Sequence, residues 1–224
     1  MTPNERWLAA MWPNVHRHLP APPATVVDLG CGALGGFVPM LRAQGYDGLG
    51  IDPQAPEGPD YFQATFEECR LPHRPQAVVA STSLHHVHDP GRVFDEIASQ
   101  LTPGGTMIVL EWDWEHFDEA TARWCFEHLD PSAEDGWLAH ARDRWMASGQ
   151  SWNDQFEAWA GEEGLHSPRT LLRALDERFD RRLSGTGPYF FPHLAGVRAA
   201  DEQAAIESGL IRAGRVDYVG VVRG

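Results

Sequence analysis

The sequence predicts an α/β fold whose sheet is mostly parallel. Between residues 25 and 112, short apolar runs rich in β-branched residues alternate with segments of helical periodicity. Glycine or proline breakers separate these segments, as at 30–36 and 102–105. This alternation is typical of βαβ units, in which helices cover both faces of a parallel sheet.

The first elements follow in the order helix, strand, helix, strand. Residues 5–18 carry an amphipathic pattern that predicts a helix, and the proline-rich stretch 19–24 ends it. The β-branched run TVVDL (25–29) predicts the first strand. FVPMLRAQG (37–45) predicts a helix, because its proline falls in the first turn and its glycine lies where a helix can end. The apolar segment GLGID (48–52) predicts the second strand.

The same order repeats further along the chain. QAVVAS (76–81) and TMIVL (106–110) predict the strands that we number fourth and fifth. Between them, Asp89 is placed as the N-cap of a helix and Pro90 as its first-turn proline. An apolar stripe over 93–101 supports that helix.

The composition and periodicity of the sequence change after Trp112. Seven of the nine tryptophans lie from Trp112 to Trp159, in stretches with helical periodicity. Ser151 is placed as the N-cap of the clearest of these helices. We expect a helical insertion over 113–165 in which the tryptophans pack the insertion. Lining of a substrate pocket is the alternative role for them.

The last part of the chain predicts one more helix and two late strands. Residues 167–179 have the pattern of a helix, and 180–191 and 215–222 predict strands around a helix at 199–209. We therefore expect a single domain with four parts. These parts are an N-terminal helix and linker (1–24), a cofactor-binding core (25–112), a helical lid (113–165) and the C-terminal part of the sheet (166–224).

Composition excludes several kinds of partner. The net charge is −14, and all 18 basic residues are arginine. A negative surface repels phosphate backbones and anionic membranes, so a small-molecule partner is favoured over nucleic acid or membrane. No apolar run approaches the roughly 20 residues that span a bilayer, and the first residues lack the signal-peptide pattern. Cys31, Cys69 and Cys125 have no C-x-x-C spacing, which indicates a reduced, cytoplasmic protein.

A glycine-rich loop follows the first strand. Gly30, Gly32 and Gly35 form a literal G-x-G-x-x-G between a strand and a helix, and the acidic Asp52 ends the next strand. This pattern admits a dinucleotide-binding enzyme such as an NAD-dependent oxidoreductase. A plain structural turn is the second alternative.

Two details of the loop favour a different ligand. Asp28 lies two residues before Gly30, where a carboxylate repels a pyrophosphate but attracts an α-amino group. No basic residue lies between residues 24 and 40 to bind phosphate. A nucleoside without phosphates but with an amino-acid tail fits these features, and S-adenosylmethionine is such a molecule.

Five segments taken together carry a resemblance to a known family. They are VVDLGCG (26–32), GIDP (50–53), FQATFEE (62–68), AVVASTSLHHV (77–87) and LTPGGTMIVLEW (101–112). In this order and spacing the sequence resembles the class I S-adenosylmethionine-dependent methyltransferases, in particular their small-molecule, type 11-like group. The resemblance covers about residues 20–112 and is only architectural beyond them. It implies a Rossmann-like, doubly wound, mostly parallel seven-stranded sheet with a helical lid inserted after the fifth strand.

The resemblance implies a set of cofactor-binding residues on these segments. Asp28 would hold the amino group of the methionine moiety, and Asp52 would accept hydrogen bonds from both ribose hydroxyls. A turn or cap is the alternative role of Asp52. The glycines would let the backbone pass close to the cofactor. The full set is Asp28, Gly30, Cys31, Gly32, Asp52, Pro53, Thr65, Phe66, Glu67, Ser81 and Thr82.

The expected adenine contacts depart from the family pattern. Phe66 would stack on the adenine and Glu67 would accept from its amino group, with core packing as the alternative for Phe66. Many relatives carry an aspartate where Thr65 stands. The glycine loop has one extra residue before its helix, which puts direct contacts by Gly35 and Gly36 in doubt.

The loop after the fourth strand, Ser-Thr-Ser-Leu-His-His-Val-His-Asp (81–89), is rich in histidine. It meets the end of the fifth strand at one edge of the sheet. We therefore expect His85 to act as general base and Glu111 to orient it or share the proton, roles that some relatives assign to these positions. Structural roles for both are the alternative. We expect His86 to pack and no metal to bind, because adjacent histidines on an irregular loop diverge.

The expected function is methyl transfer from S-adenosylmethionine to a small-molecule acceptor by in-line displacement, with S-adenosylhomocysteine as the product. Trp112, Trp114 and the run 189–191 indicate an apolar or aromatic acceptor, and core packing is their alternative role. Methyltransferases of nucleic-acid amino groups carry an Asn/Asp-Pro-Pro-aromatic run where this chain has Ser-Thr-Ser-Leu. A cofactor-binding protein that transfers no methyl group is an open alternative. The acceptor, the methylated atom and the oligomeric state are not determined by the sequence.

Overall fold

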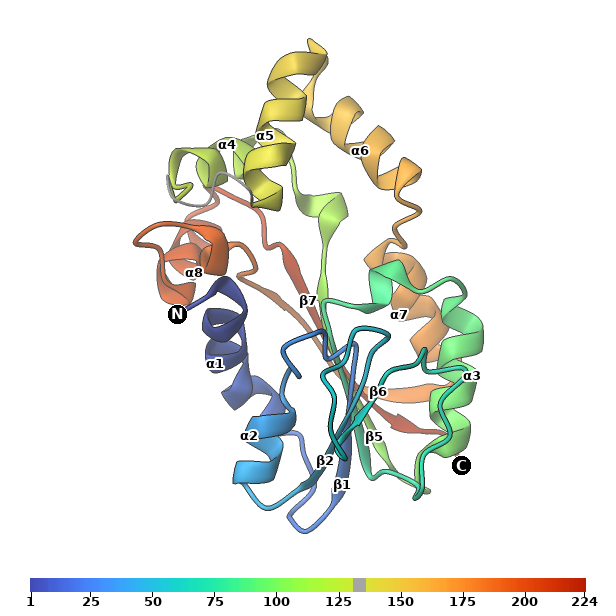
Figure 1. Ribbon diagram of the computed structural model, residues 1–224. Coiled ribbons are helices and arrows are strands. Elements are labelled where there is room, and N and C mark those ends of the chain that lie inside the picture. The colour runs from blue at the N-terminus through green and yellow to red at the C-terminus, as the bar shows by residue number, and fades with distance from the viewer. Residues whose placement is uncertain (131–135) are drawn as a thin grey trace.

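A seven-stranded mixed sheet occupies the centre of the protein (Figure 1). The computed structural model describes residues 1–130 and 136–224. The strand order is β3-β2-β1-β4-β5-β7-β6; pairs among β1 to β5 are parallel, and β7 is antiparallel to both of its neighbours. The strands are β1 (Thr25–Leu29), β2 (Asp47–Ile51), β3 (Tyr61–Phe62), β4 (Ala77–Ser81), β5 (Thr106–Trp112), β6 (Phe179–Gly187) and β7 (Arg215–Val222).

Helices cover both faces of this sheet, because successive residues of a strand point to opposite sides. Val26 and Val79 pack in one core with α1 and α2, whereas Val27 and Val78 pack in the other core with α3 and α7. Figure 1 shows these two pairs of helices on opposite sides of the sheet. Burial of both faces explains the unbroken apolar runs of the central strands. The four helices are α1 (Pro3–His16), α2 (Val38–Ala43), α3 (Pro90–Gln100) and α7 (Pro168–Asp176).

Among the described residues, three helices lie between β5 and α7 and form the predicted insertion. Figure 1 shows them in yellow-green to orange above one end of the sheet. Trp152 is fully buried there, and its Nε1 donates to the carbonyl of Phe117 at 2.6 Å. Trp137 and Trp159 are partly buried against the same core, so these tryptophans pack the insertion as expected. The helices are α4 (Glu119–Glu127), α5 (Trp137–Ser148) and α6 (Trp152–Glu162), preceded by the short turn η2 (Trp114–His116).

The first helix begins earlier than the sequence pattern predicts. It starts at Pro3 because Thr2 and Glu5 form a reciprocal cap. The amide of Glu5 lies 3.2 Å from the Thr2 hydroxyl, and the amide of Thr2 lies 2.7 Å from the Glu5 carboxylate. The caps predicted at Asp89 and Ser151 are confirmed.

The strand expected over 180–191 is shorter than predicted. It ends at Gly187, after which the chain forms the turn η3 (Phe191–His193) and helix α8 (Ala199–Glu207). The carboxylate of Glu202 causes this change of direction, because it accepts the amides of residues 189, 190 and 191 at 2.6–3.0 Å. Within the described residues, no helix has the length and apolar character needed to cross a membrane.

Candidate active site

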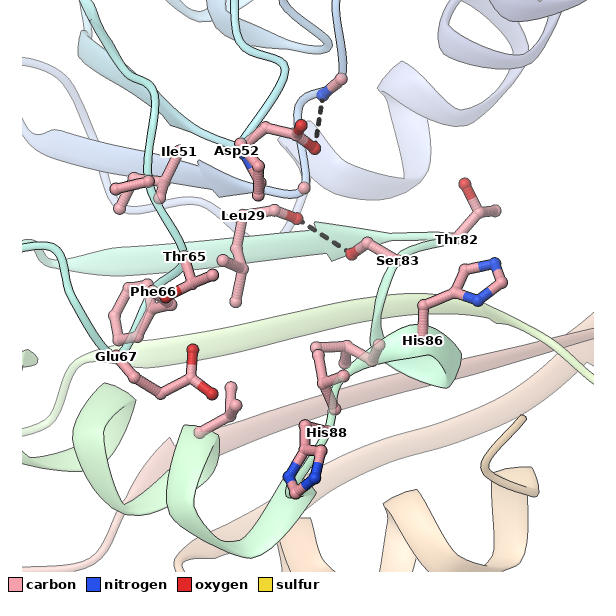
Figure 2. A pocket seen from close by; sticks show the side chains of 17 residues that line it. Leu29, Ile51, Asp52, Thr65, Phe66, Glu67, Thr82, Ser83, His86 and His88 are labelled. Atoms are coloured by element: carbon pink, nitrogen blue, oxygen red, sulfur yellow. Dashed lines mark hydrogen bonds between the residues drawn. The ribbon is translucent and has the colours of Figure 1, made fainter. Parts of the chain in front are cut away.

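A cavity of about 580 Å³ lies beyond the carboxyl ends of β1, β2 and β4 (Figure 2). The chain order of the strands reverses between β1 and β4, and open α/β sheets bind ligands at such a point. Asp28, Cys31 and Ser81 are buried and do not line the cavity. The other residues predicted for the cofactor do line it, namely Gly30, Gly32, Asp52, Pro53, Thr65, Phe66, Glu67 and Thr82.

The glycine loop forms one wall of this cavity with bare backbone. Gly30 and Gly32 have φ angles of +79° and +65°, which residues with a Cβ disfavour. A Cβ on Gly30 would lie 2.2 Å from the Cβ of Ser83, so the loop touches the segment after β4. A Cβ on Gly32 would meet no atom within 4 Å. The backbone at Gly32 is therefore open to a ligand.

Asp52 joins the end of β2 to the glycine loop. One carboxylate oxygen accepts the amide of Gly32 at 3.0 Å (Figure 2). The other accepts the amide of Gln54 at 2.7 Å. An ionised carboxylate has about four acceptor sites. Two acceptor sites therefore stay available for hydroxyl groups of a molecule in the cavity.

Asp28 lies beneath the glycine loop, with only 2% of its surface exposed. Its Oδ2 accepts the amide of Phe37 at 2.6 Å, and a Cβ on Gly36 would lie 2.1 Å from that oxygen. Burial raises the pKa of the Asp28 carboxyl to about 7, and the charge of Asp52 adds to this, against the opposing effect of the Phe37 amide. Asp28 thus ties the loop to α2 and carries a group that titrates near neutral pH.

The segment 65–67 forms another wall of the cavity. The Thr65 hydroxyl donates to the carboxylate of Glu68 at 3.0 Å. Phe66 is 3% exposed and packs in the core on the α3 side, and it also lines the cavity, so core packing is confirmed and stacking on adenine stays a prediction. Figure 2 shows the Glu67 carboxylate directed into the cavity, where it presents an acceptor to a ligand.

Ser81 and Thr82, which were both predicted to bind the cofactor, have different positions at the end of β4. The Ser81 hydroxyl accepts the indole N–H of Trp7 at 2.9 Å and so binds α1 to the sheet. Thr82 lines the cavity with a φ of +54°, a strained angle for a β-branched residue. Such strain concentrates at functional sites.

Cys31, in the glycine loop, is buried. Burial first, then the charges of Asp28 and Asp52, raises the pKa of its thiol to about 12.

His85 and Glu111 are in direct contact, as the sequence predicted for their neighbouring strands. Nδ1 of His85 lies 2.6 Å from Oε1 of Glu111, and both side chains are buried. Glu111 also accepts the amides of Leu84 and Trp112, each at 2.8 Å. A carboxylate that also accepts two backbone amides is fixed in position, so its contact with Nδ1 orients the ring of His85.

His86 is placed differently from the prediction that it packs. It is exposed and lines the cavity, and its ring centroid is 4.2 Å from that of His85. The reason is the turn η1 (Leu84–His86), which buries Leu84 and His85 and turns the next side chain outward. Ser83 and His88 also line the cavity and were not predicted. Their position directly after β4 is the signal that could have found them.

The histidines of this loop do not converge on a metal. Across residues 1–130 and 136–224, no group of three or more His, Cys, Asp or Glu side chains is arranged to hold an ion. His85 is buried whereas His86 is exposed, and the Asp89 side chain accepts the amide of Arg92 at the start of α3.

The fold and the cavity define a nucleoside-binding α/β protein of the Rossmann-like class. The family model of the methyltransferase domain matches residues 4–179, which is more than half of the chain. The chain therefore belongs to the methyltransferase-domain family, and its cofactor is S-adenosylmethionine. The cavity fits this cofactor, because it combines open backbone at Gly32, unused acceptor sites on Asp52 and the apolar ring of Phe66. No arginine lies among its lining residues to bind phosphate.

Solved structures share this fold over nearly the whole chain. An S-adenosylmethionine-dependent methyltransferase from Mesorhizobium loti is 24% identical, with 95% of this chain and 97% of that one covered and a TM-score of 0.57. Geranyl diphosphate C-methyltransferase from Streptomyces coelicolor A3(2), in complex with S-adenosylhomocysteine, is 18% identical, with coverages of 98% and 82% and a TM-score of 0.56. The N-methyltransferase NodS from Bradyrhizobium japonicum WM9 is 12% identical, with coverages of 100% and 89% and a TM-score of 0.54. No curated protein matches the sequence significantly.

Proposed function

We propose that this methyltransferase acts on a small-molecule acceptor and that His85, oriented by Glu111, removes the acceptor's proton. The observation that carries the proposal is the 2.6 Å contact between His85 and Glu111 at the end of β4, next to the cavity. S-adenosylmethionine, when bound, supplies a methyl group that its sulfonium already activates. The protein's own tasks are then to bind, to align and to accept a proton.

The cofactor-binding roles follow from the lining of the cavity. Asp52 would accept the ribose hydroxyls with the two acceptor sites that its backbone bonds leave unused. Glu67 would accept from the adenine amino group, and Phe66 would cover the adenine with its ring. Asp28 would attract the amino group of the methionine moiety from beneath the loop, directly or through water.

The proton has a short route from the cavity to the buried pair. His86 lines the cavity and its ring contacts that of His85. In the proposed path, the acceptor's proton passes to His86, which lines the cavity, and from there to Nε2 of the buried His85. Glu111 stabilises the imidazolium that forms, in a site from which water is largely excluded.

The type of acceptor rests on charge and on the loop after β4. The net charge of −14 disfavours nucleic acid and anionic membranes, and Ser-Thr-Ser-Leu differs from the run typical of enzymes that methylate bases. The further parts of the proposal are a single domain in which helices over 113–165 act as a lid, and a cytoplasmic location.

A labelled-methyl assay tests this function. The protein is incubated with methyl-labelled S-adenosylmethionine and a complete cell extract, and the products are separated by size. We expect label in the small-molecule fraction, dependent on the protein. Label confined to protein or nucleic acid, or no transfer despite tight binding of S-adenosylhomocysteine, would contradict the proposal. A calorimetric titration with NAD is the control for the competing dinucleotide assignment.

A further inference from the structure

A second cavity, of about 440 Å³, adjoins the first at Thr82. We infer that this cavity seats the methyl acceptor and that the acceptor is an uncharged molecule with a flat aromatic or apolar body. The inference rests on the proposed function. The walls of the second cavity come from the first residues of α1, the glycine loop, the end of β4 and the segment around η3. The lining residues are Thr2, Pro3, Asn4, Trp7, Leu34, Thr82, Tyr189, Pro192 and His193.

The two cavities share Thr82 as a common wall. The strained backbone at Thr82 is held in place, since its amide donates to the carbonyl of Leu110 at 2.8 Å. A cofactor in the first cavity and an acceptor in the second would therefore both lie against Thr82. An in-line displacement requires the acceptor atom and the methyl carbon to be in direct contact, with no residue between them, so the transfer would take place beside Thr82, where the two cavities meet.

Two aromatic rings of the second cavity are fixed before any ligand binds. Tyr189 stacks on Trp112 with an interplanar angle of 6° and a centroid distance of 5.6 Å, and it meets Trp7 edge-on at 5.4 Å. The indole N–H of Trp7 is bonded to Ser81, and the amide of Tyr189 is bonded to the fully buried Glu202. A flat apolar ligand would therefore bind against rings that lose little further freedom.

The second cavity carries no formal charge at neutral pH on any of its lining residues. Burial, followed by the charge of Arg6, lowers the pKa of His193 to about 4, and its Nε2 accepts the indole N–H of Trp137 at 3.3 Å. Burial raises the pKa of Tyr189, so its phenol stays protonated. The guanidinium of Arg6 is bonded to the carbonyls of Pro192, Leu194 and Val197.

An ionic acceptor would therefore lose its water here without gaining a counter-charge. The lining also includes the polar side chains of Thr2 and Asn4, which suit a hydroxyl, amide or neutral amine. The volume lies in the range of small-molecule sites. Leu34, which is 69% exposed at the rim, extends the apolar surface for the acceptor's body.

Binding of two probes of similar shape tests the inference. The titrations use 2-naphthol, which is neutral at neutral pH, and 2-naphthoate, which is an anion, each against the protein saturated with S-adenosylhomocysteine. We expect 2-naphthol to bind at least about tenfold more tightly. Equal affinity of the two probes would overturn the assignment of an uncharged acceptor.

A pair of variants on one helix locates the binding site. Asn4→Trp fills the cavity from the start of α1, and Ala9→Trp adds the same ring at an exposed position of that helix. We expect Asn4→Trp to weaken 2-naphthol binding about tenfold or more and Ala9→Trp to leave it unchanged. Unchanged binding in Asn4→Trp would overturn the inference. Failure of wild-type protein to bind S-adenosylhomocysteine would instead count against the proposed function, and a titration of 2-naphthol into the protein alone would then report on the cavity by itself.

Discussion

Nδ1 of His85 lies 2.6 Å from Oε1 of Glu111, at the adjoining ends of β4 and β5. Because Glu111 accepts two backbone amides as well, its oxygens are fixed before any ligand arrives. The pair has the geometry of a base and the group that orients it. A structural role would give the same contact, so the two roles must be separated by kinetics.

We expect Glu111→Gln and His85→Gln each to lower the rate of methyl transfer by about 100-fold, a usual contribution of a general base. The double variant should lose little more, because the two residues act as a unit. Single-turnover rates measure this, with affinity for S-adenosylhomocysteine as the second readout. His140→Gln, at an exposed position of α5, is the control. Near wild-type rates in both single variants would contradict the assignment.

Gly32→Ala should separate the cost of backbone strain from loss of cofactor binding. Gly32 and Gly104 have φ angles of +65° and +76°, and a Cβ on either would meet no protein atom within 4 Å. Alanine at either position should cost about 1–2 kcal/mol of unfolding free energy. Only Gly32→Ala should weaken S-adenosylhomocysteine binding by more than about tenfold, because its Cβ enters the cavity. Equal binding by the two variants, measured by calorimetry, would show that the cofactor lies elsewhere.

Asp52→Asn should weaken the cofactor and spare the fold. Asparagine has one acceptor oxygen in place of two, so it cannot serve the amides of Gly32 and Gln54 and two ribose hydroxyls together. The loss of charge-assisted hydrogen bonds predicts a roughly 10- to 100-fold rise in the Kd of S-adenosylhomocysteine. Asp47→Asn, at the exposed start of the same strand, is the matched control. The same Kd of S-adenosylhomocysteine for Asp52→Asn and Asp47→Asn would rule out the ribose contact.

Binding of S-adenosylhomocysteine should release a proton from Asp28 at neutral pH. The Asp28 carboxyl, with its pKa raised to about 7, is partly protonated in the free protein. A cationic amino group nearby lowers that pKa, so roughly half a proton should leave at pH 7. Calorimetry in buffers of different ionisation enthalpy measures the release. Asp28→Asn should abolish it, and an equal release in that variant would assign the proton to another group.

The same raised pKa predicts how stability depends on pH. The native state holds the Asp28 proton more tightly than the unfolded chain, whose carboxyl titrates near 3.8. The contribution of Asp28 to the free energy of unfolding is therefore complete below pH 3.8 and is lost as the pH rises through about 7. The change is roughly 4 kcal/mol. Asp28→Asn keeps an acceptor for the Phe37 amide and should flatten this part of the profile in urea titrations. An unchanged slope between wild type and variant would show that Asp28 stays ionised.

The cofactor cavity was predictable from the sequence because its parts are local to each βαβ unit. The glycines, Asp52 and the segment 65–67 each follow a strand directly, and parallel strands bring those positions to one edge. The contact between His85 and Glu111 follows from the same rule, since β4 and β5 are neighbours.

The positions of Ser81 and His86 and the existence of the second cavity depend on tertiary contacts, which no local sequence pattern encodes. Ser81 looked like a cavity residue, yet its hydroxyl bonds to Trp7 across the chain. The single turn of η1 decided that His86, rather than His85, faces the cavity. The second cavity joins residues near both ends of the sequence, and Glu202 sets the direction of the segment that holds Tyr189. Spacing along the sequence carries no signal of such pairings.

A crystal structure with S-adenosylhomocysteine bound is the most direct test of how the two cavities are used. We predict that its ribose hydroxyls bind Asp52, that its adenine lies against Phe66 and that its sulfur faces Thr82 and the second cavity. The space next to the sulfur should then be lined by Tyr189, Trp7 and the loop that carries His85 and His86. Density for the nucleoside outside the first cavity, or a sulfur that faces away from Thr82, would contradict this account.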